Sequence, residues 1–429
     1  MNIWLLRTSE PMPVVDKDER TLRMGMIAEE LSKRGHNVTW FASTFNHFTK
    51  QQSFDKDTIV KVKENYYLNL SHAPAYKKNI SLERILNHKV IANKFRKKAK
   101  NLKKPDLIYV AYPIIEYAEE AVKYGKKNNI PVIVDIRDLW PDIFNHNLPK
   151  WMRLLASPYI KLMAHKAKKI MKNAYAINSI SDAMLNWGLE KGNRTKNKMD
   201  RYFYIGYNKP TNIDVLEEYK EIDKSKFNIS FLATINNQFD YEKIAQLARN
   251  LEEKDKNIII NICGDGPQMN ELKEQIKGLN NIKLHGWLGK DELSYILKNS
   301  QIGLAPYKNT FDFQMSVSNK FAEYIAYNLP IALTSGGYMK SLLEEYNCGI
   351  STPDMDRMCD YIVELKNDRK KYDLISNNAK KLYEENFQAK KIYKDLVDYL
   401  EEIVGGKKNE IRTNRVWEDS TQSLRSSIK

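Results

Sequence analysis

The chain has 429 residues, of which 42% are hydrophobic and 29% are charged, with a net charge of +15. This composition excludes an intrinsically disordered protein, and a chain of this length ordinarily divides into at least two domains. No apolar run approaches the roughly 20 residues of a membrane span, so we expect no transmembrane helix.

Neither the N-terminus nor the cysteines indicate export. The chain enters a predicted strand directly, without the basic segment and the small-residue cleavage site of a secretion signal. Cys263, Cys348 and Cys359 have neither the spacing of a metal site nor the pattern of a disulfide framework. We therefore expect a cytoplasmic protein.

The positive charge is concentrated in two segments of the first half. Residues 73–104 contain 11 Lys or Arg against one acid, and residues 150–209 contain 13 against three. Each segment also places apolar residues at helical spacing. The two predicted apolar stripes are Ile85, Leu86, Val90, Ile91, Phe95, Ala99 and Leu102, and Trp151, Leu154, Leu155, Tyr159, Leu162 and Met163.

Basic amphipathic helices bind anionic membrane surfaces, although a helix that packs its apolar face on the protein's own core gives the same pattern. We favour peripheral binding to the inner face of the plasma membrane, because two such segments fall in one half of the chain. Nucleic acid is not an expected partner, since no recognition module or aromatic-interleaved basic strand is present.

Short apolar runs alternate with helical patterns along both halves of the chain. In the first half, helices are expected at 20–35 and 114–128, and in the second half at 239–254, 266–278, 291–299 and 319–328. The predicted strands lie at 2–6, 37–43, 59–65, 66–70, 106–113, 131–138, 174–181 and 202–207, and at 228–235, 257–264, 281–286, 302–307 and 331–335. This alternation predicts parallel sheets.

The pattern predicts two doubly wound Rossmann-like α/β domains that face each other across a cleft at the carboxyl ends of their strands. We expect the first domain over 1–209 and the second over 210–380, beginning with a polar linker at 209–226. A helix over 381–404 is expected to pack back on the first domain. Residues 405–429 are polar and predict a mobile tail.

Three motifs of the second half have the residue types of a nucleotide site. In ICGDGP, Gly264 and Gly266 let a main chain approach a ligand at a helix start, although glycines also serve ordinary turns. In LHGWL, Trp287 and Leu288 follow a similar turn. In QMSVSNKFAEYIAYNLP, Ser318 or Asn319 can cap a helix that carries Lys320 and then Glu323. A lysine at a helix start suits a phosphate and a carboxylate suits sugar hydroxyls, although surface capping gives the same pattern.

Other enzyme classes find little support in the sequence. The three D-x-D triplets, at 16–18, 55–57 and 354–356, read as surface residues, and Asp354 reads as a helix cap. The seven histidines have no zinc spacing, and neither GxSxG nor a Walker loop is present. These absences argue against a metal hydrolase and a P-loop ATPase.

Taken in this order and spacing, ICGDGP, LHGWL and NKFAEYIAYNLPI resemble the donor domain of family-4 retaining glycosyltransferases of the GT-B fold. In the first half, SEPMP, Arg20 with Arg23, LSKRGHNVTWFASTFNH and DIRDLWPD are similar to the bacterial subgroup that builds surface polysaccharides, the branch of fucosamine-type transferases. The resemblance extends over about residues 1 to 400. It implies transfer of a sugar from a nucleoside-diphosphate sugar, most simply a UDP-sugar, with retention at the anomeric carbon.

The resemblance also assigns roles to residues of the second half. Gly264 and Gly266 would approach the nucleotide, and the main chain at Trp287 and Leu288 would hold the base. Glu323 would take the ribose hydroxyls. Residues 315–320, including Ser318, Asn319 and Lys320, would face the sugar and the diphosphate. No metal or other cofactor is expected, because a helix dipole and basic side chains can offset the diphosphate charge.

Two departures from the family pattern stand out. The family's first glutamate would fall at Met315, and its Arg/Lys pair after the first donor-domain strand is replaced by Asn236, Asn237 and Gln238. Neutralisation of the phosphates would then depend on Lys320 and on Arg137 or Lys308. The strand end YVAYP also lacks a histidine that relatives often have there.

In the first half, VIVDIRDLWPDIF ends a predicted buried strand in several charges. We expect Asp138 to orient or deprotonate the acceptor and Arg137 to contact phosphate, although an ion pair of Arg137 with an aspartate would brace the loop equally well. Glu10, Arg23 and Trp140 are the other residues expected near the acceptor.

The sequence therefore predicts a glycosyltransferase that moves a sugar, of which an N-acetylated hexosamine is the expected kind, onto an isoprenoid-diphosphate-linked saccharide. Capsule, O-antigen or exopolysaccharide synthesis would use such a product. Two alternatives stay open at this point: a UDP-sugar 2-epimerase of the same fold, and a sugar-nucleotide-binding subunit without catalysis.

Overall fold

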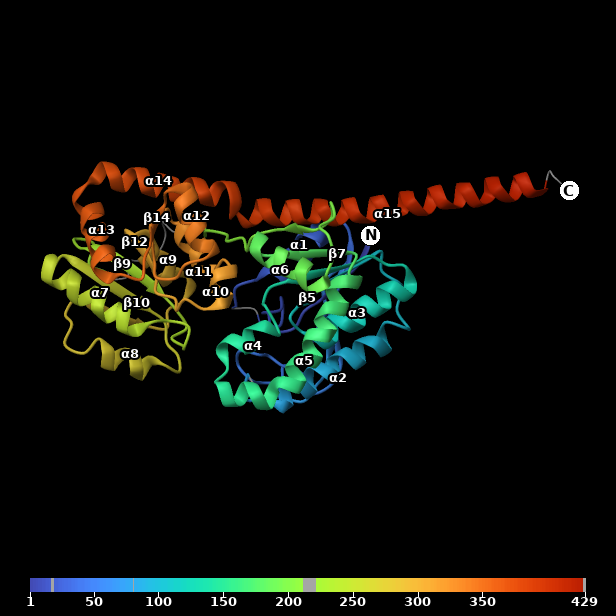
Figure 1. Cartoon of the computed structure of the whole chain (residues 1–429), viewed down its shortest axis with the longest axis horizontal. Helices are drawn as coiled ribbons and strands as arrows, with labels where there is room; N and C mark the ends of the chain where they lie inside the picture. The colour runs from blue at the N-terminus through green and yellow to red at the C-terminus, as the bar shows by residue number, and fades with distance from the viewer. Residues whose placement is uncertain (17–18, 80, 211–220, 427–429) are drawn as a thin grey trace. The chain divides into compact units, whose positions relative to one another are not determined.

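A computed structural model describes the chain except for residues 17–18, 80, 211–220 and 427–429, and it describes only the backbone of residues 147 and 408–426. The chain divides into two compact units, each of which is an α/β domain with its own sheet (Figure 1). The first unit is Met1–Phe203 with Tyr393–Lys429, and the second is Tyr204–Ile392. Most of the predicted linker at 209–226 lies outside the described residues.

The first sheet has eight strands in the order β3-β4-β2-β1-β5-β6-β7-β8. They are β1 (Asn2–Leu6), β2 (Asn37–Ser43), β3 (Thr58–Lys63), β4 (Tyr66–Ser71), β5 (Leu107–Tyr112), β6 (Val132–Ile136), β7 (Ala176–Ser179) and β8 (Arg201–Tyr202). All neighbours are parallel except β3 and β4, which form an antiparallel edge. Every residue of β5 and β6 is buried, as apolar runs of central parallel strands predict.

The helices of the first unit cover both faces of this sheet. They are α1 (Arg23–Lys33), α2 (Leu82–Lys98), α3 (Ile115–Asn128), α4 (Asp142–Asn147), α5 (Lys150–Asn173), α6 (Asp182–Gly192) and, from Tyr393, α15 (Ala389–Ser426). Figure 1 shows α2, α3 and α5 together on one face, with α1 and α15 on the other. On the first of these faces, Phe95 meets Trp4, Phe41 and Tyr117 edge-on, with ring centres 5.2 to 6.0 Å apart.

The two predicted apolar stripes are only partly buried. In α2 the buried face contains His88, Ile91 and Phe95, whereas Leu86 is half exposed. In α5 the buried residues begin at Ile160 and continue with Met163, Ala167, Ile170 and Met171. The first half of α5, by contrast, keeps Trp151, Leu154 and Leu155 in solvent.

The second sheet has six strands, all parallel, in the order β11-β10-β9-β12-β13-β14. They are β9 (Phe227–Leu232), β10 (Ile258–Cys263), β11 (Ile282–Gly286), β12 (Ile302–Ala305), β13 (Ile331–Leu333) and β14 (Gly349–Ser351). The order is that of a Rossmann sheet, and β4-β2-β1-β5-β6-β7 repeats it in the first unit. The sequence analysis missed β14, which has only three residues.

The helices of the second unit are α7 (Tyr241–Lys254), α8 (Met269–Gln275), α9 (Lys290–Lys298), α10 (Phe311–Met315), α11 (Asn319–Ala326), α12 (Tyr338–Tyr346), α13 (Met355–Asn367) and α14 (Arg369–Asn386). Side chains cap several of them: Asp240, Asp354 and Asp368 each accept hydrogen bonds from main-chain N–H groups in the first turn. The predicted capping role of Asp354 is thus confirmed.

The predicted tail at 405–429 is helical as far as Ser426, as part of α15. Gly405 and Gly406 do not end the helix, and the residues that follow them are mostly good helix formers. The mobility predicted for 405–429 stays a prediction. Among the described residues, no helix has the length and apolarity that crossing a bilayer requires.

Tyr324 fixes α11 to the second sheet. Its buried hydroxyl accepts a hydrogen bond from Leu232 N (3.0 Å) and donates one to Leu304 O (3.0 Å), which joins the ends of β9 and β12. Its ring fills the space above Gly303, where a Cβ would lie 2.3 Å from the ring. A single side chain therefore sets the position of α11 over both strands.

We expect Tyr324→Phe to lower the free energy of unfolding by about 2 to 3 kcal/mol, because it leaves two buried main-chain groups without a partner. Chemical denaturation would measure this loss. Tyr346→Phe is the matched control, since Tyr346 donates to Glu385 (2.8 Å) at the surface, and it should cost less than about 1 kcal/mol. Equal losses in the two variants would contradict the role given to Tyr324.

Candidate functional site

The strand order of the second sheet indicates where a ligand would bind. β9 and β12 are neighbours, but the chain leaves β9 toward β10 and leaves β12 toward β13, on the opposite side. In doubly wound sheets, ligands bind outside the carboxyl ends of the strands at such a switch point. The candidate site therefore comprises loop 233–240, loop 306–310 and the helix starts beside them.

Three aromatic rings join these two loops. Phe239 stacks on Tyr307 with ring centres 5.1 Å apart, and Tyr307 stacks on Phe313 of α10 at 4.2 Å. Lys308 N also donates a hydrogen bond to Gln238 O (2.9 Å). The loops thus form one rigid apolar wall, with the side chain of Lys308 exposed beside it. The sequence analysis missed this wall, although each ring shortly follows a switch-point strand.

The start of α11 carries the predicted phosphate-binding residues. Ser318 caps the helix by accepting a hydrogen bond from Phe321 N (3.2 Å), as predicted. The Lys320 ammonium lies 5.6 Å from the centre of the Phe239 ring. Burial lowers the pKa of Lys320, and the negative charge of Glu323 opposes that shift.

Within the described part of the chain, no acceptor lies within hydrogen-bond or ion-pair distance of the Lys320 ammonium. Asn319 is exposed at the first position of α11, and Glu323 lies one turn later and is partly exposed. The structure therefore brings together all four residues predicted on this helix. An unneutralised cation at a helix N-terminus is a suitable place for an anion.

Gly264 and Gly266 are required by packing between loops. A Cβ on Gly264, which has φ of +137°, would lie 1.7 Å from Ala233 O, and a Cβ on Gly266 would lie 2.3 Å from Ile235 O. Ile235 N donates to Asp265 O (3.0 Å) in the same contact. The main chains are therefore too close for any side chain, which explains both glycines without a ligand. Their approach to a nucleotide stays a prediction.

The LHGWL turn lies next to the ICGDGP loop, as two turns on one sheet edge should. Gly264 N donates to Gly286 O (2.6 Å). Trp287 is 74% exposed, whereas Leu288 is 9% exposed and anchors the turn. The turn therefore presents a main chain and one free indole ring, and its contact with a base stays a prediction.

Met315, which stands where the family has a glutamate, is the last residue of α10. The loop after β13 packs tightly against this helix: a Cβ on Gly337 would lie 2.3 Å from Gln314 Cα, and Gly336 N donates to Asn309 Oδ1 (3.1 Å). Asn309 and Gln314, both exposed, are polar groups of this edge that the sequence analysis missed. The sequence signal for this close packing was the pair Gly336 and Gly337 shortly after β13.

In the first unit, three arginines and two acids form a buried network at the carboxyl ends of β1 and β6. Asp135 is fully buried and accepts hydrogen bonds from Arg23 Nε and Nη2 (both 3.1 Å) and from Arg137 Nε (2.6 Å). Arg137 also pairs with Glu10, and Arg7 Nε lies 3.3 Å from a carboxylate oxygen of Glu10. Burial disfavours the charge of Asp135, but Arg23 and Arg137 outweigh it and lower its pKa.

This network changes the interpretation of three predicted acceptor residues. The ion pair between Arg137 and an aspartate, the alternative to a phosphate contact, is present. Arg23 and Glu10 are 3% and 7% exposed, and Glu10 also accepts a hydrogen bond from Met24 N (2.9 Å) at the start of α1. These side chains hold the edge of the sheet together, so we assign them a positioning role.

Asp138 and Trp140 are the predicted residues of this segment that reach the surface. Asp138 is partly exposed and accepts a hydrogen bond from Leu139 N (2.7 Å). Trp140 packs between Phe144, at 4.8 Å between ring centres, and the guanidinium of Arg84, at 4.9 Å from its own ring centre. The ring of the buried His88 lies 6.4 Å from Trp140.

The sequence of the second unit matches a known family. Residues 226–368 match the family model described as glycosyl transferases group 1. This segment is therefore similar to the group 1 glycosyltransferases. It contains all six strands of the second sheet and α11, with Lys320 and Glu323. No curated protein sequence matches the chain.

Solved structures of similar fold cover nearly the whole chain. Sucrose-phosphate synthase from Thermosynechococcus elongatus has a TM-score of 0.69 and 12% identity over 94% of this chain and 99% of its own. Anabaena HepE in complex with UDP has a TM-score of 0.63 and 14% identity over 94% of this chain and 99% of its own. WaaG, a glycosyltransferase involved in lipopolysaccharide biosynthesis, has a TM-score of 0.62 and 12% identity over 93% of this chain and 99% of its own. The predicted GT-B fold, with two Rossmann-like domains, is confirmed, whereas the fucosamine-type subgroup stays a prediction.

No group of three or more His, Cys, Asp or Glu side chains is placed to hold a metal ion within the ranges that the structure describes. Metal independence nevertheless stays a prediction.

Buried His88 should make stability depend on pH. Burial, with the charge of Arg84 second, lowers the pKa of His88 to about 3, whereas the unfolded chain has about 6.5. Above pH 6.5 both states are neutral. As the pH falls from 6.5 toward 3, only the unfolded state gains the proton, so stability is lost. At pH 5 this loss is about 2 kcal/mol.

In His88→Gln, the free energy of unfolding should therefore fall by about 2 kcal/mol less between pH 7.5 and pH 5 than in the wild type. Denaturant titrations at both pH values measure this difference. His165→Gln, at an exposed position of α5, should keep the wild-type dependence. A His88→Gln variant that loses as much stability as the wild type would show that His88 is charged in the folded protein.

Proposed function

We propose that the protein is a retaining glycosyltransferase that moves a sugar from a UDP-linked donor, held by the second unit, to a lipid-linked saccharide. The observation that carries this proposal is the unneutralised Lys320 at the start of α11, beside the Phe239–Tyr307–Phe313 wall and inside the segment that matches the group 1 family model. HepE, which shares the fold, has been solved with UDP and with UDP-glucose, which supports the choice of donor.

The residues of α11 would act on charge and position. The diphosphate would lie at the helix N-terminus with Lys320, and Glu323 would hold the ribose hydroxyls. Because no carboxylate neutralises Lys320 at close range, its charge remains for the phosphate as the bond to the leaving group lengthens. Lys308, beside the same wall, is the second cation that would offset the diphosphate in place of the missing Arg/Lys pair.

In the proposed reaction, the acceptor hydroxyl oxygen forms a bond to the anomeric carbon on the face from which UDP leaves. The bond between that carbon and the diphosphate oxygen breaks, and the hydroxyl proton passes to the departing phosphate. The configuration at the anomeric carbon is thereby retained. Asp138 is proposed to orient the acceptor, while Arg137 positions that loop through Asp135 and Glu10.

The acceptor is proposed to be an isoprenoid-diphosphate-linked saccharide of a bacterial surface polysaccharide, and the sugar an N-acetylated hexosamine. WaaG, which shares the fold and is involved in lipopolysaccharide biosynthesis, supports this general class. A protein acting on such an acceptor would work at the inner face of the plasma membrane.

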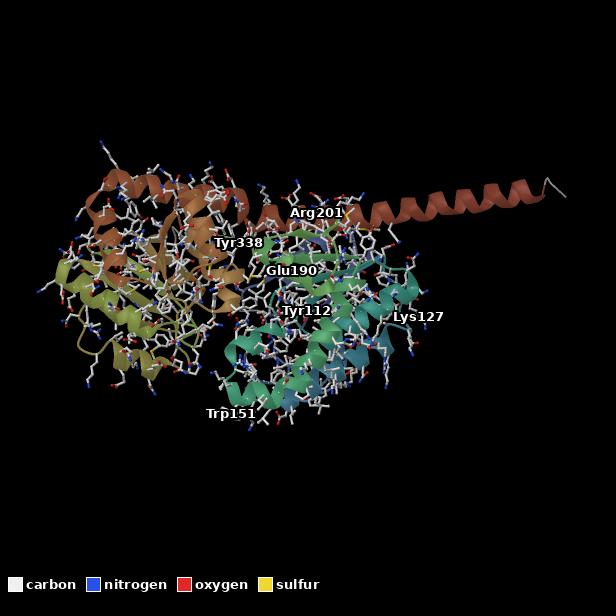
Figure 2. All side chains as sticks on the ribbon, viewed as in Figure 1. Tyr112, Lys127, Trp151, Glu190, Arg201 and Tyr338 are labelled. Carbon is white, nitrogen blue, oxygen red and sulfur yellow. The ribbon has the colours of Figure 1, made fainter. Side chains whose placement is uncertain are left out.

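The first half of α5 supports membrane contact. Trp151, Leu154, Leu155 and Leu162 are 51 to 77% exposed on this helix, with Lys150 just before the first of them and Lys161 just before the last. Figure 2 labels Trp151 at the start of α5, where it is 66% exposed. Large apolar side chains interleaved with lysines suit the interface of an anionic bilayer.

Lys320→Ala should reduce UDP affinity and lower kcat/KM for sugar transfer by about 10²- to 10³-fold, because it removes one preorganised charge from the diphosphate. Calorimetry with UDP and a transfer assay with a UDP-sugar measure both effects. Lys340→Ala, an exposed ion-paired lysine of α12, should change neither. Unchanged UDP binding and turnover in Lys320→Ala would refute this assignment.

Changing both Leu154 and Leu155 to Ser should weaken binding to phosphatidylglycerol vesicles at least about tenfold, because each exposed leucine contributes up to about 2 kcal/mol when buried. Vesicle sedimentation measures this change. Leu374→Ser, 57% exposed on α14, is the control and should bind as the wild type does. If the double variant sediments with the vesicles as the wild type does, α5 is not the membrane-contacting surface.

A further inference from the structure

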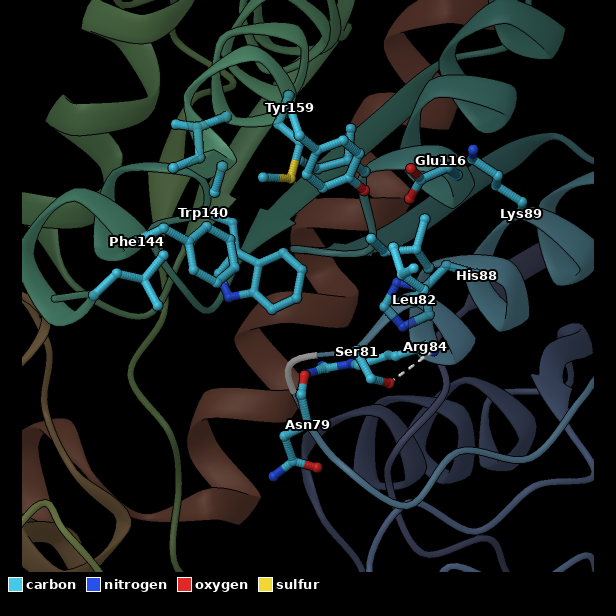
Figure 3. Close-up of a pocket in the computed structure, with 16 residues that line it drawn as sticks. Asn79, Ser81, Leu82, Arg84, His88, Lys89, Glu116, Trp140, Phe144 and Tyr159 are labelled. Atoms are coloured by element: carbon cyan, nitrogen blue, oxygen red, sulfur yellow. Dashed lines mark hydrogen bonds between the residues drawn. The ribbon is translucent and has the colours of Figure 1, made fainter. Parts of the chain in front are cut away.

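A pocket of about 510 Å³ lies in the first unit between the start of α2, α4 and the first half of α5. Most of its wall is apolar: Ile85, Phe144, Leu148, Ala156, Ile160 and Met163 line it. Figure 3 shows Trp140 and Phe144 together on one side of the pocket, with Tyr159 beyond them and Leu82 and His88 opposite. Its volume is in the range of small-ligand sites, about 300 to 1,000 Å³.

One end of this pocket is cationic. Arg84, which lines the pocket, holds its guanidinium 4.9 Å from the Trp140 ring centre and 5.8 Å from that of Tyr76. Arg84 Nη1 donates to Asn79 O (2.7 Å), whereas Arg84 Nε is buried without a hydrogen-bond partner among the described residues. The Lys50 ammonium lies 4.9 Å from the centre of the same Tyr76 ring.

The titration of neighbouring groups is consistent with an excess of positive charge at this end. Burial, and then the charge of Arg84, lowers the pKa of Lys50. Burial, with Lys50, Arg84 and Arg7, lowers the pKa of His47 to about 4. Asp138 is the acid that acts on Arg84 in the opposite sense. Positive side chains therefore outnumber carboxylates among these groups, as a site for an anion requires, although Glu116 also lines the pocket.

The apolar part of the pocket selects the rest of the ligand. A sugar or a nucleoside would leave its hydroxyl groups without partners against side chains such as Phe144, Leu148 and Met163, at a cost for each. A hydrocarbon chain gains about 0.8 kcal/mol for each buried CH₂ group. The pocket is also formed in part by α5, whose exposed apolar residues are those proposed above to contact the membrane. A chain could thus pass from the bilayer into the pocket along a single helix.

We propose that this pocket binds the first isoprene units of a polyprenyl diphosphate, with the hydrocarbon against α4 and α5 and the diphosphate at Arg84 and Lys50. This inference deepens the proposed function, on which its identification of the ligand as the acceptor rests. It places the lipid and the phosphates of the acceptor in the first unit, next to Trp140. Trp140 is on the same loop as Asp138. A phospholipid could offer the same chemistry, and the experiment separates the two.

The probe is farnesyl diphosphate, added to the full-length protein. Binding is measured by calorimetry and by the fluorescence of Trp140. The Trp140 signal is the part of the tryptophan fluorescence that Trp140→Phe removes. We expect saturable binding to the wild type, weaker binding of farnesol, and weak binding of inorganic diphosphate. Ala156→Phe places a ring in the pocket and should weaken farnesyl diphosphate binding at least about tenfold. Ala164→Phe, the same change two turns later on α5, should not.

Arg84→Gln separates the charged end from the apolar part. It should weaken farnesyl diphosphate binding by about tenfold while changing farnesol binding by less than about twofold, since the lost partner interacts only with phosphate. Arg96→Gln, at an exposed position of the same helix, should leave both affinities unchanged. Thermal unfolding and UDP binding of each variant show whether the fold is intact.

Three results would overturn the inference: a wild-type protein that binds UDP but not farnesyl diphosphate, binding that neither Ala156→Phe nor Arg84→Gln weakens, and equal displacement of the probe by dihexanoyl phosphatidylglycerol, which would make this a phospholipid site. The first of these leaves the glycosyltransferase proposal standing. Conversely, farnesyl diphosphate binding through these residues in a protein that binds no UDP-sugar would refute the glycosyltransferase and keep the lipid pocket.

Discussion

The first unit depends on one fully buried carboxylate. Asp135, at the end of β6, holds Arg23 at the start of α1 and Arg137 in the loop that follows its own strand. Arg23 Nη1 in turn donates to Phe203 O (2.8 Å), beyond β8. Elements more than a hundred residues apart are thereby tied to one point. Removing one partner from such a network leaves an uncompensated buried charge, which is far costlier than losing a surface ion pair.

The basic side chains discussed above fall into two groups. Arg23 and Arg137 each have acidic partners within the fold, which neutralise their charges. Lys320 and Arg84 have no carboxylate at ion-pair distance among the described residues. Cations that have no carboxylate partner within the fold are preorganised for an external anion, whereas neutralised ones are not. This distinction, more than the number of basic residues, indicates where phosphates would bind.

Much of the architecture could be predicted from the sequence, because buried parallel strands are apolar throughout and strands and helices alternate regularly. The start of α11 was predictable for the same kind of reason, since Ser318 is a strong N-cap and fixes the phase of Lys320 and Glu323. The burial of Arg137 was not predictable, because it depends on Glu10 and Arg23, which lie far away in the chain. Likewise, periodicity alone could not separate the exposed Leu154 from the buried Met163 on one helix, since only the neighbouring helices decide which turns are covered.

The two glycines of ICGDGP have a consequence for how such motifs are used. Both positions are closed to any side chain by the main chain at Ala233 and Ile235, whatever the loop binds. Selection on folding alone would therefore preserve them in a descendant that had lost its chemistry. Among distant relatives, these glycines therefore show that the fold has been inherited. Evidence that catalysis has been retained must come from other side chains, whose loss the fold would tolerate.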